Sequence, residues 1–249
     1  MTGMAHSALV TGGAQGLGAA IVRALHAQGF KVAIGDVDFE HASALADDLG
    51  ASDGSTLPLR LDVREQGDFE AALAAMVARW GSAEVLVNNA VVTEAKPVLA
   101  IGPAEFDAVM RVNVGGVFIG SQVFGRAFKA AGYGRIVNIA SLAGQNGGTA
   151  TGAHYAASKG AIITLTKVFA RDLAADGVTV NAIAPGPLDV PSVHRLVPKE
   201  RLAALVESIP VRRLGDPAYV AELVCLLASE RSAFTTGATW DVNGGLFMR

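Results

Sequence analysis

The stretch Thr11-Gly12-Gly13-Ala14-Gln15-Gly16-Leu17-Gly18 decides the fold. It follows the short apolar run Ala8-Leu9-Val10 and precedes residues 17–28, whose apolar side chains recur at helical spacing. A strand, a glycine turn and a helix in this order bring bare backbone to a helix N-terminus, where a pyrophosphate can bind. A tight structural turn is the alternative, because the chain has 29 glycines. The flanking strand and helix favour the phosphate site.

Apolar strands and helices alternate along the rest of the chain. Strands are predicted near residues 31–36, 57–61, 84–88, 135–139, 178–183 and 238–242, and helices near 39–49, 65–80, 103–131, 155–175 and 217–228. Continuously apolar strands that alternate with helices indicate a parallel sheet covered on both faces. We therefore expect a single α/β domain over residues 1–249, with a Rossmann-type doubly wound sheet of about seven strands.

Composition excludes several classes of partner. The formal net charge is -3, and the 20 Lys and Arg residues are scattered, so neither nucleic acid nor a membrane surface is expected. Residues 1–6 lack a signal-peptide pattern, and Ala8-Leu9-Val10 is too short to span a bilayer, so we expect a cytoplasmic protein. Cys225 is the single cysteine and is expected to be a buried, inert thiol. The five histidines show no ligand spacing, so no metal site is expected.

Asp36 ends the second predicted strand, 24 residues after Gly12. An acidic side chain at this place accepts hydrogen bonds from the adenine ribose hydroxyls of a dinucleotide. Its charge opposes a 2'-phosphate by about 1 kcal/mol in water and by up to about 4 kcal/mol at an effective dielectric near 20. No Arg or Lys lies in the glycine loop or directly after Asp36. NAD is therefore the expected cofactor; a solvated strand-end carboxylate is the alternative.

Tyr155 alone among the three tyrosines has a lysine, Lys159, four residues further on. The two side chains share a helix face, and a nearby cation favours the phenolate, whose ordinary pKa is near 10. A phenolate can remove the proton of an alcohol, and a phenol can return it to a developing alkoxide. Ser141, after the predicted strand at 135–139, can bind the same oxygen; a helix or turn cap fits its position equally well.

Taken together, these residues resemble the shorter, cofactor-first branch of the short-chain dehydrogenase/reductase family over essentially the whole chain. The motifs that carry the resemblance are Thr11 to Gly18, Asp62-Val63, Asn88-Asn89-Ala90, Asn113, Ser141, Tyr155-x-x-x-Lys159, Asn181 and Pro185-Gly186. The cofactor contacts that it implies are Gly12, Gln15, Gly16, Leu17, Gly18, Asp36, Asp62, Val63, Asn89, Ala90, Tyr155, Lys159, Pro185, Gly186 and Leu188.

The resemblance also implies roles. Asp62 and Val63 would lie beside the adenine, Asn89 and Ala90 would line the cofactor cleft, and Lys159 would also bind the nicotinamide ribose. Asn113 would hold a helix kink and a proton-relaying water, and the catalytic set would be Asn113, Ser141, Tyr155 and Lys159. Structural roles are the alternatives: Asp62 as the cap of the helix near Glu65, Asn88 and Asn89 as partners of neighbouring backbone, and Asn113 as a simple kink.

Two positions depart from the family pattern. Val91 stands where a glycine usually follows Asn88-Asn89-Ala90, which adds bulk beside the nicotinamide ribose. Val190 stands where a threonine hydroxyl often holds the carboxamide, and backbone near Leu188 is the expected substitute. These departures put the detailed nicotinamide pose in doubt and leave the proton and hydride transfer intact.

The resemblance implies an NAD(H)-dependent oxidoreductase that interconverts a secondary alcohol and a ketone, assembled as a homotetramer. The substrate pocket is expected from residues 92–94, 142–154 and 187–210, the last being a mobile lid. The candidate substrate contacts are Ser141, Leu142, His154, Tyr155 and Val193. Their mixture of apolar and polar groups does not distinguish one small-molecule alcohol or ketone from another.

Three other functions fit parts of this sequence. An NADPH-dependent 3-oxoacyl thioester reductase is the alternative within the enzyme class, and a non-catalytic dinucleotide-binding protein would be favoured by loss of Tyr155, Lys159 or Ser141, none of which is lost. A hydrolase is suggested by Gly50-Ala51-Ser52-Asp53-Gly54, which matches a nucleophile elbow literally. That motif follows a helix and precedes a strand, the reverse of the order that an elbow requires.

Overall fold

The protein folds around one parallel sheet, which confirms the predicted fold class. The computed structural model describes residues 6–50, 54–148 and 151–249. All pairings in the sheet are parallel, and the strand order is β3-β2-β1-β4-β5-β6-β7. The strands are β1 Ser7–Thr11, β2 Lys31–Asp36, β3 Thr56–Arg60, β4 Val85–Asn88, β5 Gly134–Ile139, β6 Val178–Pro185 and β7 Thr239–Val242.

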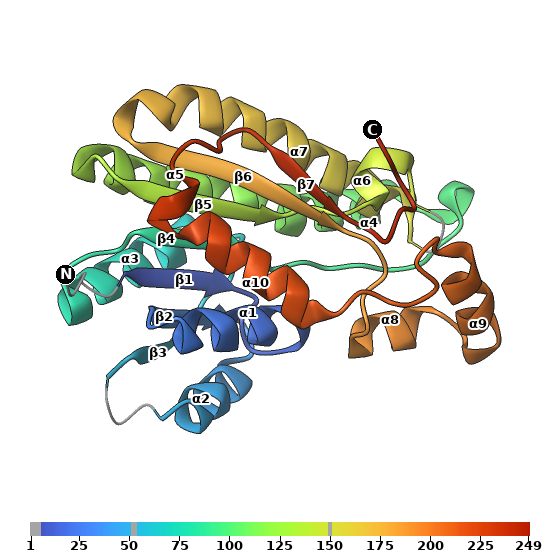
Figure 1. Cartoon of the computed structure of the whole chain (residues 1–249), viewed down its shortest axis with the longest axis horizontal. Coiled ribbons are helices and arrows are strands. Elements are labelled where there is room, and N and C mark those ends of the chain that lie inside the picture. Colours follow the sequence, from blue (N-terminus) through green and yellow to red (C-terminus); the bar gives the residue numbers. More distant parts are fainter. Residues whose placement is uncertain (1–5, 51–53, 149–150) are drawn as a thin grey trace.

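Helices connect the strands and cover both faces of the sheet (Figure 1). They are α1 Gly16–Ala27, α2 Phe39–Asp48, α3 Gln66–Trp80, α4 Pro103–Met110, α5 Gly116–Ala131, α6 Ala143–Asn146, α7 Ala153–Leu173, α8 Pro191–Leu196, α9 Lys199–Ser208 and α10 Pro217–Ala228. No helix among the residues described is long and apolar enough to cross a membrane.

Two apolar layers hold the helices on the sheet. On one face Leu25 of α1 and Val224 of α10 pack with alternate strand residues such as Val10. On the other face Phe69 of α3 and Phe124 of α5 pack against the opposite side chains of the same strands. The inner strands β2, β1, β4, β5 and β6 are therefore buried on both sides, which is why they read as apolar runs in the sequence, whereas the edge strands β3 and β7 are more exposed.

The predicted helix over 103–131 is not one regular helix. A five-residue π-helical turn, Arg111–Gly115, separates α4 from α5 and contains Asn113. Asn113 is buried, and its side-chain amide bonds to backbone of another segment. π-turns often mark functional sites, and this one carries the asparagine for which the resemblance implied a kink.

Strand order reverses between β1 and β4, so the crevice beyond the carboxyl ends of these strands is the expected ligand site of a doubly wound sheet. The predicted lid segment contains α8 and α9, which stand at this end of the sheet, beyond β6 (Figure 1). Cys225 of α10 is half-buried rather than fully buried, and burial raises the pKa of its thiol to about 11.

Candidate active site

A cavity of about 1190 Å³ lies beyond the carboxyl ends of the strands. Every residue that the sequence assigned to the cofactor lines it, as do Ser141, Leu142 and Val193 from the catalytic and substrate sets. Two predicted site residues do not line it: Asn113 and His154. Asn146, Thr151 and Leu205 also line it and lie within the predicted substrate segments, whereas Arg64 and Leu246 lie outside every predicted segment.

The glycine loop forms one end of the cavity and is built from close backbone contacts. A Cβ on Gly18 would lie 1.9 Å from the carbonyl oxygen of Gly12, so no larger residue fits there. Asn89 donates from Nδ2 to the carbonyl oxygens of Thr11 (3.1 Å) and Gly12 (2.9 Å), which ties the loop to the end of β4. The result is a bare backbone cradle at the start of α1, which fits the pyrophosphate of a dinucleotide. The structural role considered for Asn89, hydrogen bonding to neighbouring backbone, is therefore present. Asn89 also lines the cavity, as the family resemblance implied.

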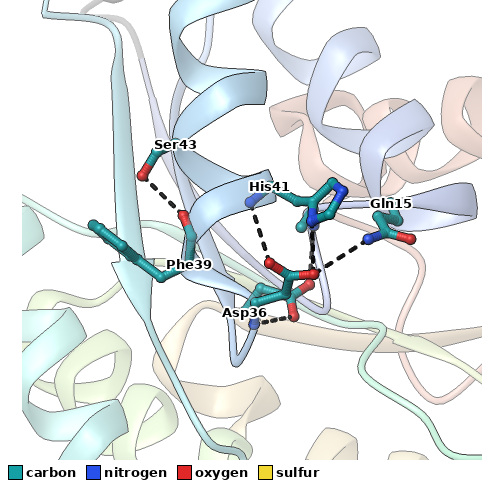
Figure 2. Close-up of polar contacts among 7 residues, drawn as sticks. Gln15, Asp36, Phe39, His41 and Ser43 are labelled. Carbon is teal, nitrogen blue, oxygen red and sulfur yellow. Dashed lines mark hydrogen bonds and ion pairs between the residues drawn. The ribbon is translucent and has the colours of Figure 1, made fainter.

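Asp36 ends β2 and lines the cavity beside the glycine loop, and both of its carboxylate oxygens accept backbone hydrogen bonds. Oδ2 accepts from the N–H of Ala14 (3.1 Å), and Oδ1 accepts from the N–H of Asp38 (3.1 Å). Asp38 in turn accepts from Gln15 Nε2 (3.4 Å) and lies 2.7 Å from His41 Nδ1, so Gln15 and His41 point toward one carboxylate (Figure 2). Two carboxylates thus stand beside the glycine loop.

Asp62 is bound by Arg64, which the sequence analysis did not single out. Arg64 donates from Nε and Nη2 to the Asp62 carboxylate at 2.5 to 3.0 Å, and this pairing holds the pKa of Asp62 at about 2. Asp62 Oδ1 also accepts the N–H of Arg64 (3.0 Å). The side chain therefore closes a turn before α3, and it still lines the cavity beside Val63.

Tyr155, Lys159 and Ser141 meet at the opposite end of the cavity. Lys159 Nζ lies 5.6 Å from the centre of the Tyr155 ring and donates to the carbonyl oxygen of Ile139 (2.6 Å). Burial raises the pKa of Tyr155, and a hydrogen bond with the Ser141 side chain opposes that shift. Burial lowers the pKa of Lys159 to about 7. We expected Lys159 to lower the pKa of Tyr155, but burial has the larger effect and the pKa of Tyr155 is raised.

Asn113 acts on the site through other residues. Its side chain accepts from the N–H of Val92 (2.9 Å) and donates to the carbonyl oxygen of Val92 (3.0 Å) and to Ser158 Oγ (3.0 Å). Ser158 Oγ donates to the carbonyl oxygen of Tyr155 (2.7 Å). The π-turn thus holds the segment after β4 against the first turns of α7. Ser158 was not predicted, although its place three residues after Tyr155 is a usable signal.

The substrate side of the cavity differs from expectation at His154. Its side chain has no exposed surface and packs beneath the start of α7, so it does not face a substrate. Glu94 also lies outside the lining residues; its carbonyl oxygen accepts from the N–H of Gly152. Val92, Thr93, Val193 and Val197 line this side, the last two from the segment that was predicted to be a lid.

The two departures from the family pattern both border the cavity. Val91 is 43% exposed, so its extra bulk meets open space, whereas Val190 is buried at the start of α8. Leu188 forms a parallel bridge with Gly215, which anchors the segment before α8.

Asn181 lies elsewhere, bonding Thr235 and Ala238 between β6 and β7. Of the motif weighed for a hydrolase, Ala51-Ser52-Asp53 lie outside the described residues.

Comparison with known proteins places this arrangement in a family. The model of a family described as enoyl-(acyl carrier protein) reductase matches residues 12–247. The chain is 37% identical over 244 residues to 3-oxoacyl-(acyl-carrier-protein) reductase of Escherichia coli, covering 97% of each chain. It is 34% identical over 240 residues to the enzyme of that name in Thermotoga maritima, covering 96% of this chain and 97% of the relative.

A third relative has a different thioester in its name. The chain is 37% identical over 245 residues to acetoacetyl-CoA reductase of Shinella zoogloeoides, covering 98% of this chain and 100% of the relative. The chain belongs to the short-chain dehydrogenase/reductase family. It is therefore an oxidoreductase, and membership of the short-chain dehydrogenase/reductase family implies a nicotinamide dinucleotide as cofactor. Gly12, Gly16 and Gly18 line the cavity without side chains, so bare backbone at the start of α1 is available to the phosphates of such a group.

Proposed function

We propose that this protein interconverts a 3-oxoacyl thioester and its 3-hydroxyacyl thioester, with NAD(H) preferred to NADP(H). The observation that carries the reaction type is the meeting of Tyr155, Lys159 and Ser141 on one wall of the cavity that the glycine loop also lines. The substrate class is taken from the names of the relatives, which favour a thioester over an unspecified secondary alcohol.

Tyr155 moves the proton in this scheme. Because burial raises the pKa of Tyr155, its phenol holds the proton and can donate it to the alkoxide that develops during ketone reduction. Ser141 binds the phenol side chain and is placed to orient the same substrate oxygen. A bound nicotinamide dinucleotide supplies the hydride in reduction and accepts it in oxidation. Lys159, held by Ile139, places a titratable amine beside Tyr155.

Asp36 supports the choice of NAD(H). Its carboxylate is fixed by two backbone N–H groups beside the glycine loop, and Asp38 places a second carboxylate nearby. A 2'-phosphate beside fixed carboxylates is disfavoured by like charge. The relatives' names do not state a dinucleotide. A preference for NADPH would revive the NADPH-dependent alternative and remove Asp36 as the determinant.

The segment over α8 and α9 is the part of the site that we assign to the acyl chain. Val190, Val193, Val197 and Leu205 give the cavity an apolar wall there, which suits an acyl group better than a polyol. A simple secondary alcohol without a thioester remains the second candidate. The same catalytic residues would act on such an alcohol. The two candidate substrates differ only in the size of the group that the segment over α8 and α9 must accommodate.

The deciding experiment measures turnover of acetoacetyl-CoA with NADH and with NADPH, beside a panel of simple ketones and secondary alcohols. We expect the thioester with NADH to give the highest kcat/KM. Tyr155→Phe is the control, and general acid catalysis makes its expected loss in kcat roughly 10²- to 10⁴-fold. Turnover of Tyr155→Phe at the parent rate would refute the proposed role of Tyr155.

We also propose that the chain assembles as a homotetramer, as the family resemblance implies. Phe118 of α5 and Val168 of α7 are large apolar side chains on the surface, and Phe118 contacts the ring of Phe169 at 5.9 Å between centroids. Light scattering on the purified protein tests the assembly, and a monomeric mass would refute it.

A further inference from the structure

His154 directly precedes Tyr155 and is the second residue of α7. Its ring is completely buried, and Nδ1 accepts a hydrogen bond from the backbone N–H of Tyr155 (2.9 Å). That N–H belongs to the first turn of the helix, where backbone donors have no partner within the helix. The His154 ring therefore performs the task that an N-cap side chain usually performs.

The N-cap residue, Gly152, cannot do this itself. It has no side chain, and a Cβ built on it would lie 2.3 Å from Cε1 of His154 and 2.9 Å from the carbonyl oxygen of Glu94. The N–H of Gly152 donates to that same carbonyl oxygen (3.0 Å). A serine or aspartate cap is thus sterically excluded, and the packing of the start of α7 depends on the His154 ring.

The other ring nitrogen faces a carboxylate. Because Nδ1 accepts a hydrogen bond, Nε2 carries a hydrogen. Nε2 lies 3.8 Å from Glu105 Oε1 of α4, and within the described part of the chain neither atom has a hydrogen-bond partner. Glu105 Oε2 is held by Lys96 Nζ (2.5 Å), and this bond lowers the pKa of Glu105 below its usual value. The Nε2–H therefore faces an ionised group.

Lys96 lies in the connection between β4 and α4, the segment that brings Val92 and Thr93 to the cavity wall. The chain of contacts runs from this wall through Lys96, Glu105 and the His154 ring to the backbone of Tyr155. This chain of contacts is separate from the bonds of Asn113 to Val92 and Ser158. The first turns of α7 are thus held at two places, at His154 and at Ser158.

We propose that His154 is a positioning residue for Tyr155, with Nδ1 fixing the first turn of α7 and Nε2 tying that turn to Glu105 and Lys96. The inference rests on the proposed function, because it takes Tyr155 as the residue that moves the proton. Misplacing a catalytic group by about 1 Å can cost on the order of 100-fold in rate. Loss of the ring should therefore lower kcat and leave the KM for NADH unchanged, since the glycine loop is untouched.

Two substitutions separate the two ring nitrogens. In His154→Asn the amide oxygen stands at the place of Nδ1 and can accept the Tyr155 N–H, with nothing at the place of Nε2. In His154→Gln the terminal amide reaches the place of Nε2 and can donate to Glu105, with no acceptor at Nδ1. His154→Ala removes both, and His26→Ala, at a half-buried histidine in the last turn of α1 that does not line the cavity, is the matched control.

The experiment measures kcat, the KM for NADH and the exchange rate of the Tyr155 amide hydrogen in each variant. We expect His154→Ala and His154→Gln to lose roughly tenfold or more in kcat, with the KM for NADH within about twofold of the parent. We expect His154→Asn to recover most of kcat and to slow amide exchange relative to Ala. If His154→Ala does not fold, the Asn and Gln variants decide the matter alone.

A kcat of His154→Gln equal to that of the parent would overturn the positioning role. So would a loss of kcat in each variant that is fully explained by the fraction of protein that is unfolded. Equal rates of Tyr155 amide exchange in the Asn and Gln variants would also overturn it. Failure of the proposed function is distinguishable, because it appears as full activity in Tyr155→Phe whatever the His154 variants show.

Discussion

The Lys159 ammonium lies 5.6 Å from the centre of the Tyr155 ring and is bound by the carbonyl oxygen of Ile139 at the end of β5. The side chain is only 2% exposed, and burial lowers its pKa from 10.5 to about 7. The catalytic tyrosine of the proposed reaction therefore has as its neighbour an amine that changes charge near neutral pH. This has consequences for the stability of the protein as well as for its activity.

Replacing Lys159 by methionine should abolish a pH dependence of stability. Between pH of about 7 and 10.5 the unfolded chain holds the Lys159 proton and the folded chain does not, so the parent becomes more stable as pH rises. From pH 7 to 8.5 the expected gain is roughly 1–2 kcal/mol in the free energy of unfolding. Urea unfolding of ligand-free protein measures it. An equal rise in Lys159→Met would assign the effect to other groups.

Asp36→Ser should move cofactor preference toward NADPH. The serine can still accept the N–H of Ala14, while the charge that opposes a 2'-phosphate is gone. The ratio of kcat/KM for NADPH to that for NADH should rise roughly ten- to thousandfold. Glu40→Gln, at an exposed carboxylate in the first turn of α2, is the control for a change in net charge. A similar shift in both variants would mean that Asp36 has no specific role.

Much of this fold was predictable because its signals are local. Strands buried on both faces leave continuous apolar runs, and the glycine loop is contiguous in sequence between β1 and α1. The pairing of Tyr155 with Lys159 follows from helix periodicity alone. These features need no knowledge of which distant segments meet.

What sequence reasoning missed depends on distant contacts. His154 stands after a glycine-rich segment and was a candidate substrate contact, with an ordinary loop histidine as the alternative, but Gly152 and Glu105 enclose its ring. The pairing of Arg64 with Asp62, and the part that Leu246 takes in the cavity wall, have no periodic signal. The pKa of Lys159 reflects burial, which the Tyr-x-x-x-Lys spacing does not report.

Gly18→Ala and Gly16→Ala should differ sharply, although both lie in the glycine loop. A Cβ on Gly18 meets the carbonyl oxygen of Gly12 at 1.9 Å, so the loop must rearrange and dinucleotide binding should be lost. At Gly16 nothing lies within 4 Å, and the cost is the strain of a left-handed residue (φ 55°), about 1–2 kcal/mol. Fluorescence titration with NADH compares them. Equal affinities would contradict the close packing of the loop.

Asn113→Leu should damage stability and turnover together, because Asn113 satisfies both backbone groups of Val92. A leucine of similar size leaves that N–H and carbonyl without these partners, at a cost of about 1–3 kcal/mol for each group left buried. The segment that carries Val92 should then loosen from α7, so kcat should fall more than the unfolded fraction explains. Ser158→Ala removes only one of the three bonds of Asn113 and is the graded control. Urea unfolding and kcat at saturating NADH measure the two effects. If Ser158→Ala proved as damaging as Asn113→Leu, the bond to Ser158, rather than the hold on Val92, would be the important contact.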